Sequence, residues 1–360
     1  MTAQLVDVVE TSAEAAALDI PPLLVLDALA RHLDDRGIGT GPIHWERIGE
    51  GQSNVTYRIR RDGADVVLRR GPRPPLPRST HDMVREARIQ TVLRGQGVAV
   101  PRIIDVCEDE TVLGVPFYLM DFVPGTVVTD TLPEILAPAE ARQAFGEELI
   151  DRLASLHDVD VAVPEVAALG RPEGYLERQV ALFSALWEKN TRRALPAVGH
   201  LGEWLEANRP ETQRHSVVHG DYRAGNAMLA PTAPVRVTAI LDWEMSTLGD
   251  PLADLGYFLA TYTDGRHPRT VMDLTPVTSG PGFPDRAELT ARYRDRTGLD
   301  LTSLPWYQAL ALWKAAIFSE AIYTRWLAGE APAAGDFTGA LEQGVPALLD
   351  VAGEVAATLR

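Results

Sequence analysis

Hydrophobic residues recur at helical spacing early in the chain. Leu26, Leu29 and Leu33 lie three and four residues apart, in a segment that begins at Pro21 and ends near Gly37. This spacing places them on one side of an α-helix. The sequence therefore predicts a helix over about residues 21–37, preceded by a polar N-terminal tail.

From residue 43 the pattern changes to short runs typical of β-strands. HWERIGEG, SNVTYRIRR and ADVVLRR follow one another, and Asp62-Gly63 marks a turn between the last two. These runs predict a small antiparallel sheet. The proline-rich segment GPRPPLPR should be a loop that leads into a helix over 81–94, and VPRIIDVCED and VPFYLMDFV should add two strands.

Helical periodicity dominates after Pro124-Gly125. One β interruption breaks it, formed by SVVHGDYRAGNAML and VRVTAILDWEM, two apolar strands that each run into a cluster of polar residues. We expect an α+β, bilobal chain with a sheet-containing N-lobe over 1–122 and a mainly helical C-lobe over 123–360. The helices of the C-lobe are predicted over 137–156, 175–190, 201–208, 286–297 and from 306 onward.

Composition and net charge limit the classes of molecule that this chain is expected to bind. The 360 residues are 46% hydrophobic and 23% charged, which is ordinary for a globular enzyme, and the net charge is −16. An acidic surface disfavours nucleic acid and anionic membranes. The single cysteine, Cys107, excludes an intramolecular disulfide, and the sequence contains neither a signal-like N-terminus nor a long apolar stretch, so we expect a cytoplasmic protein.

The strongest chemical signal follows the two strands of the β interruption. His219, Gly220, Asp221 and Asn226 form the pattern HGDxxxxN, and Asp242 follows the next strand. Phosphoryl transfer needs a carboxylate that orients and deprotonates the attacking hydroxyl, and oxygen ligands for Mg²⁺. These side chains provide both.

The pattern resembles that of the aminoglycoside phosphotransferase family, which has a bilobal protein-kinase-like fold. GEGQSNVTYRI is similar to the family's nucleotide-covering loop, VVLRR to its third strand and LDWEMSTLGDPLADLGY to its metal-binding segment and following helix. GFPDRAELTARY and the aromatic final helices resemble the branch associated with acyl-CoA dehydrogenases. The resemblance implies a kinase that transfers the γ-phosphoryl group of ATP or GTP to a hydroxyl of a small molecule, with the nucleotide between the lobes.

The resemblance also implies roles for individual residues. Asp221 would be the catalytic base, Asn226 and Asp242 would hold Mg²⁺, and Asp250 and Asp254 would support the site. The nucleotide-binding residues would be those of the covering loop, the third strand, its helix partner and the segment joining the lobes: Gly49, Gly51, Ser53, Asn54, Arg69, Glu86, Met120, Asp121, Phe122 and Val123. Acceptor binding against the C-terminal helices would involve Tyr307, Trp313 and Glu320.

Other interpretations remain open at this stage. Arg69 stands where the kinase pattern has lysine, which leaves a catalytically silent nucleotide-binding regulator as the alternative function. His157 is expected to be a buried or capping residue, and Trp306, Leu310 and Trp313 recur on one helical face typical of core packing. The acceptor could be an aminoglycoside-like compound, an amino alcohol or a hydroxyacyl compound, and the sequence does not define the oligomeric state.

Overall fold

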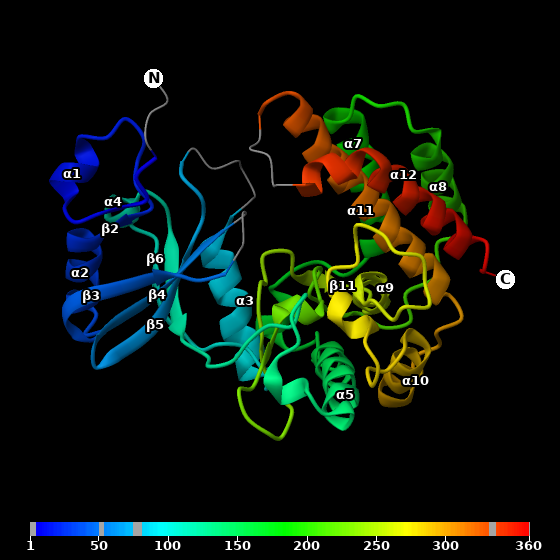
Figure 1. Ribbon diagram of the computed structural model, residues 1–360, viewed down its shortest axis with the longest axis horizontal. Coiled ribbons are helices and arrows are strands. Elements are labelled where there is room, and N and C mark those ends of the chain that lie inside the picture. Colours follow the sequence, from blue (N-terminus) through cyan, green and yellow to red (C-terminus); the bar gives the residue numbers. More distant parts are fainter. Residues whose placement is uncertain (1–4, 50–53, 75–80, 331–335, 360) are drawn as a thin grey trace. The chain divides into compact units, whose positions relative to one another are not determined.

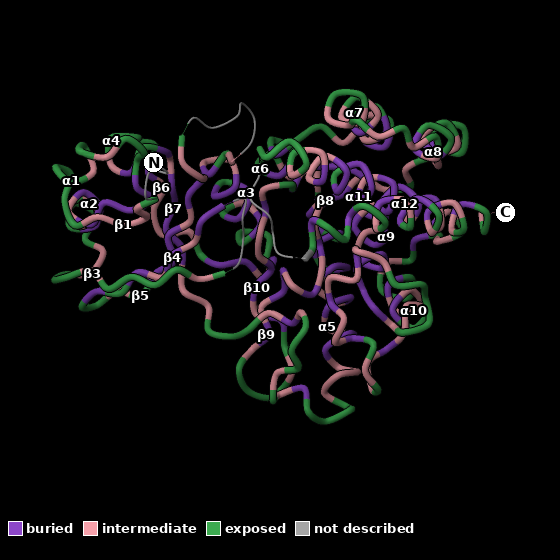
Figure 2. Tube along the Cα trace, turned by 45° about the horizontal axis from the view of Figure 1, so that its top comes forward, coloured by how far each residue is buried: buried purple, intermediate pink, exposed green. Residues whose placement is uncertain are grey.

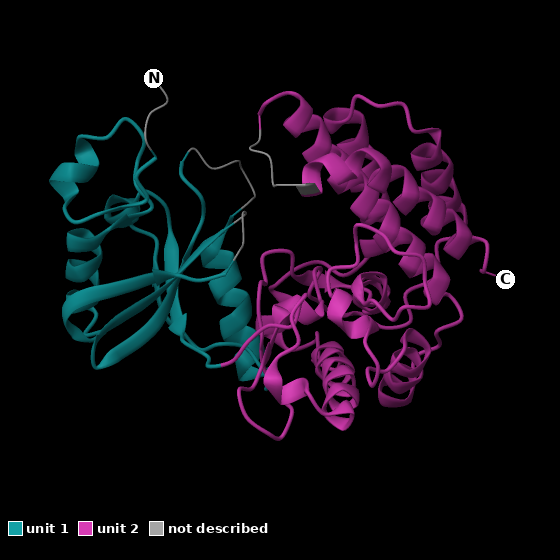
Figure 3. Ribbon diagram, viewed as in Figure 1, with its two compact units in different colours: residues 1–124 teal, residues 125–360 magenta. Residues whose placement is uncertain are grey.

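The computed structural model describes residues 5–49, 54–74, 81–330 and 336–359. The chain divides into two compact units, residues 1–124 and residues 125–360 (Figure 3). The sequence placed the boundary after residue 122, and the functions assigned to the two segments stay predictions.

The first unit is built around a five-stranded antiparallel sheet with the strand order β3-β4-β5-β7-β6 (Figure 1). The strands are β3 (Thr40–Arg47), β4 (Val55–Asp62), β5 (Ala64–Arg70), β6 (Ile103–Cys107) and β7 (Phe117–Asp121). The turn between β4 and β5 contains Gly63 at a φ of 80°, a left-handed conformation that favours glycine. The predicted hairpin therefore forms at Asp62-Gly63.

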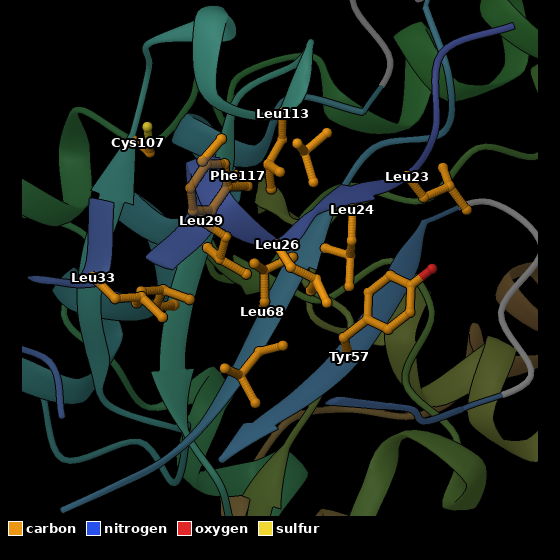
Figure 4. Close-up of a cluster of buried hydrophobic side chains, with 14 of the residues drawn as sticks. Leu23, Leu24, Leu26, Leu29, Leu33, Tyr57, Leu68, Cys107, Leu113 and Phe117 are labelled. Carbon is orange, nitrogen blue, oxygen red and sulfur yellow. The ribbon is translucent and has the colours of Figure 1, made fainter. Parts of the chain in front are cut away.

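Strand alternation gives this sheet two apolar faces. Tyr57, Leu68 and Phe117 pack against α2 (Leu26–Asp35), whose leucines point toward the sheet in Figure 4. The opposite face packs against α3 (Met83–Gly95), using Val67, Tyr118 and Met120 of the sheet and Met83 and Ala87 of the helix. Because Arg69 lies two residues after Val67, its side chain belongs to the α3 face.

The N-terminal segment is more ordered than the polar tail expected from the sequence, so that expectation was wrong. β1 (Val8–Val9) pairs in parallel with β2 (Leu24–Val25), and α1 (Ser12–Ala16) lies between them. Thr11 caps α1 by accepting from the Glu14 backbone amide, and the Glu14 carboxylate accepts from the Thr11 amide. The short helix α4 (Glu110–Leu113) completes the unit.

The second unit is mainly helical, and α11 forms its centre. Side chains of α11 are buried along nearly its whole length, and Figure 2 shows this helix largely in purple. Trp306, Leu310, Trp313 and Ile317 are each no more than 2% exposed, which confirms the predicted core stripe. The longer helices are α5 (Ala139–His157), α7 (Tyr175–Asn190), α8 (Pro196–Ala207), α9 (Leu252–Thr261), α10 (Arg286–Thr297), α11 (Leu304–Leu327) and α12 (Asp336–Ala356), and α6 (Pro164–Ala167) is a single turn.

Two short strand pairs interrupt these helices and carry the motif residues. β8 (Ser216–Val218) pairs antiparallel with β11 (Thr247–Gly249), and β9 (Ala227–Leu229) pairs antiparallel with β10 (Val237–Ile240). The expected α+β fold, with an antiparallel sheet in the N-terminal part and a helical C-terminal part, is confirmed. A search of the described helices found none long and apolar enough to cross a membrane.

Candidate active site

The HGD segment begins where β8 ends. Gly220 has a φ of 87°, and a Cβ atom at this position would lie 2.8 Å from the backbone oxygen of Met245. Both the left-handed backbone and the close approach disfavour any larger residue. Glycine is therefore required at this position, and the loop can turn so that Asp221 leaves the strand.

The Asp221 carboxylate is held on both oxygens. The Tyr257 hydroxyl donates a hydrogen bond to Oδ1, and Asn226 Nδ2 donates to Oδ2 at 2.8 Å. The Arg223 guanidinium lies 3.6 Å from Oδ2. About a quarter of the Asp221 side chain remains exposed. Because a carboxylate oxygen carries two lone pairs, each oxygen can still accept one more hydrogen bond.

Tyr257 lies on α9 and was not among the site residues predicted from the sequence. Burial raises the pKa of the Tyr257 hydroxyl well above its ordinary value, and the neighbouring Asp221 carboxylate raises it further. The hydroxyl therefore stays protonated and acts as a donor. The available signal was the tyrosine that ends LGDPLADLGY, but its contact with Asp221, 36 residues earlier, depends on how α9 packs.

Asn226 and Asp242 bring further oxygen atoms to the same region. Asn226 Nδ2 donates to both the backbone oxygen and Oδ2 of Asp221, so its own side-chain oxygen is directed to other partners. The Leu241 amide donates to the Asn226 carbonyl at 2.8 Å, which joins the segments before Asp242 and around Asn226. Asp242 has a φ of 67°, and a non-glycine residue in this conformation is often found at a functional site.

This donor set suits a hard cation. Mg²⁺ is usually bound by one or two protein oxygens together with phosphate oxygens and water. A search of the described residues found no cluster of three or more His, Cys, Asp and Glu side chains suited to a metal. Amide and carboxylate oxygens are ligands of the kind that Mg²⁺ takes in proteins, so Asn226 and Asp242 fit the predicted ion, and its binding here stays a prediction.

His219 stabilises the loop, and hydrogen bonds at both of its ring nitrogens define which one carries the proton. Its Nδ1 atom accepts from the Asp221 amide at 3.2 Å, so Nε2 carries the proton and donates to the Leu241 carbonyl at 2.9 Å. Its ring also lies against Trp243, with 4.6 Å between the ring centroids. His219 therefore links the residue before Asp242 to the backbone of Asp221 and has no surface exposure of its own.

Asp254 is the buried acceptor beneath the loop. Its Oδ2 atom accepts from the His219 amide at 2.6 Å and its Oδ1 atom from the Gly220 amide at 2.8 Å, while His157 Nε2 lies 3.2 Å from Oδ2. Burial acts to raise the pKa of Asp254, but the hydrogen bond and charge of His157 outweigh it, and the pKa lies below its ordinary value. His157 is buried and also bonds to Tyr293, in keeping with a structural role.

The residues considered for acceptor binding are buried and have partners of their own. The Tyr307 hydroxyl donates to Asp250 Oδ2 at 2.9 Å, and Trp313 Nε1 donates to the Val198 carbonyl at 2.9 Å. Glu320 is fully buried and forms an ion pair with Arg193. These contacts give all three side chains a packing role, and their part in acceptor binding stays a prediction.

In the first unit, Arg69 forms an ion pair with Glu86. Arg69 Nε lies 3.0 Å from Glu86 Oε1, and Glu86 is 1% exposed. The Tyr118 hydroxyl donates to the same carboxylate at 3.1 Å, and Gln90 donates to that hydroxyl. The network fixes the Arg69 stem on the α3 face of the sheet, with 14% of the side chain exposed.

The loop predicted to cover the nucleotide is described only at its two ends. Gly49 is exposed and has a φ of 76°, and Asn54 is buried with Oδ1 2.8 Å from His81 Nδ1. Gly51 and Ser53 lie outside the described residues, as do residues 75–80 of the expected proline-rich loop. The phosphate contacts predicted for this loop therefore stay predictions.

The segment expected to contact the adenine follows the last strand of the sheet. Met120 and Asp121 are the final residues of β7, and Phe122 and Val123 continue beyond it. The Asp121 carboxylate pairs with Arg102, and the Arg58 guanidinium lies 3.6 Å from the centroid of the Phe122 ring. These contacts order both side chains, and the backbone role in adenine binding stays a prediction.

Two pockets on the second unit lie away from Asp221 and Asn226. One, of about 470 Å³, lies between α5 and α10 and is lined by Glu147, Leu289 and Arg292 among others. The other, of about 460 Å³, includes His157, Asp160 and Arg214. Neither is lined by Asp221 or Asn226, so the site is defined by its converging side chains and hydrogen bonds.

The fold and the HGD segment together define a kinase-like phosphotransferase class. The model of the phosphotransferase enzyme family matches residues 44–292. The chain belongs to this family.

Individual relatives support this placement. The chain is 34% identical over 314 residues to mouse acyl-CoA dehydrogenase family member 10, covering 86% of this chain but only 29% of that protein. A Ralstonia eutropha structure described as a candidate aminoglycoside phosphotransferase is 30% identical, with a TM-score of 0.78 and coverage of 93% of this chain and 98% of that one. The branch resemblance noted in the sequence is therefore confirmed.

A more distant structure shares the fold alone. Spectinomycin phosphotransferase, solved with ADP and spectinomycin, is 13% identical, with a TM-score of 0.59 and coverage of 91% of this chain and 98% of that one.

Proposed function

We propose that this chain transfers the γ-phosphoryl group of ATP to a hydroxyl group of a small molecule, with Asp221 as the base. The observation that carries the proposal is the Asp221 carboxylate, which is held by Tyr257 and Asn226 and keeps acceptor capacity on both oxygens. Membership of the phosphotransferase family supports the reaction class. The match covers only 29% of mouse acyl-CoA dehydrogenase family member 10 and 36% of human acyl-CoA dehydrogenase family member 11, so the other activities of these proteins are not carried over.

In the proposed reaction, Asp221 accepts the proton of the acceptor hydroxyl as its oxygen attacks the γ-phosphorus. The new bond joins that oxygen to phosphorus, and the bond between the γ-phosphorus and the bridging oxygen breaks, so that ADP leaves with the electron pair. Positioning of the two reactants provides most of the rate enhancement in such transfers. The two hydrogen bonds to Asp221 keep the carboxylate in one orientation for this step.

Asn226 and Asp242 would hold Mg²⁺ through side-chain oxygens. When bound, the cation neutralises negative charge on the β- and γ-phosphates. In the first unit, Arg69 would bind phosphate oxygens, and its ion pair with Glu86 fixes the stem from which the guanidinium reaches them. We propose that the backbone of 120–123 contacts the base of the nucleotide.

The test is an ADP-release assay with Mg·ATP on the wild type and on Asp221→Asn, across hydroxy acids, amino alcohols and aminoglycosides. The variant keeps the shape of the side chain and removes its basicity, so turnover should fall by about 10²–10⁴-fold while ATP binding by calorimetry is retained. Turnover within a few-fold of the wild type would refute the role of Asp221. ATP binding without turnover for any acceptor would instead favour a silent nucleotide-binding regulator.

A further inference from the structure

Lys314 is a half-buried cation that the proposed reaction does not use. The sequence contains only two lysines among its 34 basic Lys and Arg residues, and the other, Lys189, is exposed at the end of α7. Lys314 lies in the middle of α11, between buried residues. Burial lowers the pKa of Lys314 to about 8, against the opposing effect of the Asp254 charge. A cation held at such a desolvation cost is a candidate for function.

The contacts of Lys314 hold the ammonium group without neutralising it. Nζ donates to Gln179 Oε1 at 2.7 Å and lies 4.7 Å from the centroid of the Phe183 ring, both on α7. Across the described part of the chain, no carboxylate lies within ion-pair distance of Nζ. An ammonium has three N–H donors, so two remain for a ligand.

The spacing of residues along α11 and along α7 relates Lys314 to the loop that carries Asp221. On α11, Lys314 lies on the same side of the helix as Tyr307. Seven residues, or about two turns, separate it from Tyr307, so both lie on one face of the helix, about 10 Å apart along the axis. Tyr307 bonds to Asp250, and its backbone abuts Gly256 of α9.

The spacing of residues along α7 leads to the same loop. Gln179 lies one turn after Tyr175, whose ring covers Gly249 at the end of β11, the partner strand of β8. The Asp254 charge that acts on Lys314 belongs to the carboxylate that holds the His219 and Gly220 amides. Through Tyr307 and Tyr175, both helices that flank the ammonium therefore pack against the segments that support Asp221.

We infer that Lys314 binds a carboxylate of the acceptor, so that the substrate is a hydroxycarboxylate rather than a polyamine. A single ammonium beside a neutral amide and an aromatic ring matches a monoanion with an apolar stem, whereas a cationic aminoglycoside would be repelled at this position. This inference rests on the proposed function for its hydroxyl acceptor. The net charge of −16 does not exclude such an anionic acceptor, because the positive charge at Lys314 is local.

The experiment measures binding and turnover of straight-chain hydroxycarboxylates, each compared with its neutral amide. The variants are Lys314→Met, which keeps the length of the stem, and Lys189→Met as the matched control, with folding checked by circular dichroism and urea unfolding. Losing a buried charge-assisted hydrogen bond should weaken carboxylate affinity, measured by calorimetry, by about 10- to 100-fold in Lys314→Met. Lys189→Met should match the wild type, and the amides should bind weakly to all three proteins.

Calorimetry and ADP release separate this inference from the proposed function. Carboxylate binding that depends on Lys314, without ADP release, would support the inference and count against the kinase proposal. Phosphorylation of neutral or cationic acceptors at rates that Lys314→Met leaves unchanged would overturn the inference and leave the kinase proposal standing. Equal binding of acid and amide, or no binding of either, would also overturn it.

Discussion

Replacement of Asp254 by asparagine tests the support beneath the loop that carries Asp221. The carboxylate accepts two backbone amides, from His219 and Gly220, and contacts His157. Asparagine keeps one oxygen but turns an NH₂ group toward a donor, so at least one loop amide loses its acceptor. An amide left unsatisfied costs about 1–3 kcal/mol, and a lost hydrogen bond to a charged group costs about 1.5–3 kcal/mol. Because the two ranges describe the loss of one and the same hydrogen bond, we expect Asp254→Asn to lower the free energy of unfolding by about 2–3 kcal/mol.

Tryptophan fluorescence during urea unfolding measures this change in the second unit, because six of the seven tryptophans lie there and only Trp45 lies in the first. Asp295→Asn is the matched control. Asp295 is 70% exposed on α10, so its replacement should change the free energy of unfolding by less than about 0.5 kcal/mol. A loss below about 1 kcal/mol in Asp254→Asn would refute the supporting role.

The pH dependence gives the same prediction a second readout. The folded pKa of Asp254 lies below its ordinary value of 3.8. The unfolded chain therefore binds the proton more readily, and the stabilisation by Asp254 is present above pH 3.8 and lost as pH falls toward the folded pKa. The difference between wild type and Asp254→Asn should be constant near neutrality and shrink only below that value. A difference that already shrinks between pH 7 and pH 5 would point to another group.

Two further substitutions test the residues around Asp221. Tyr257→Phe removes the hydroxyl that donates to Asp221 and keeps the ring, so kcat should fall about 10-fold while the KM for ATP changes less than about two-fold; an unchanged kcat in steady-state assays would argue against a positioning role. Asp242→Ala should abolish the increase in ATP affinity that Mg²⁺ gives, as measured by calorimetry with and without EDTA. Affinity that still responds to Mg²⁺ would contradict the metal role of Asp242.

Local patterns in the sequence predicted the elements whose limits are set by local chemistry. The structure has α7 and α10 with the predicted limits, and Asp285 begins α10 through a capping box with Glu288. The helix predicted from residue 201 starts earlier, at Pro196, because proline is accommodated in the first turn of a helix. β1 and β2 were not predicted, because two-residue strands exist only through their mutual pairing.

In the candidate site, too, local sequence patterns predicted some residues, whereas others depend on tertiary packing. Motif spacing predicted Asp221, Asn226 and Asp242 as site residues, since the residue types and their order follow from the chemistry of phosphoryl transfer. Tyr257 could not be assigned, because its contact with Asp221 depends on the packing of α9 and no periodicity encodes it.

The acceptor residues were the hardest to predict because α11 is enclosed on nearly every side. A surface helix has one apolar stripe, and its polar face then indicates where a ligand can bind. In α11, buried side chains occur around the helix, so Glu320 and Lys314 both interrupt an apolar sequence and look alike from the pattern. Their contacts separate them. Glu320 is neutralised by Arg193, whereas Lys314 keeps its charge beside a neutral amide, and only the second arrangement leaves a charge for a ligand to bind.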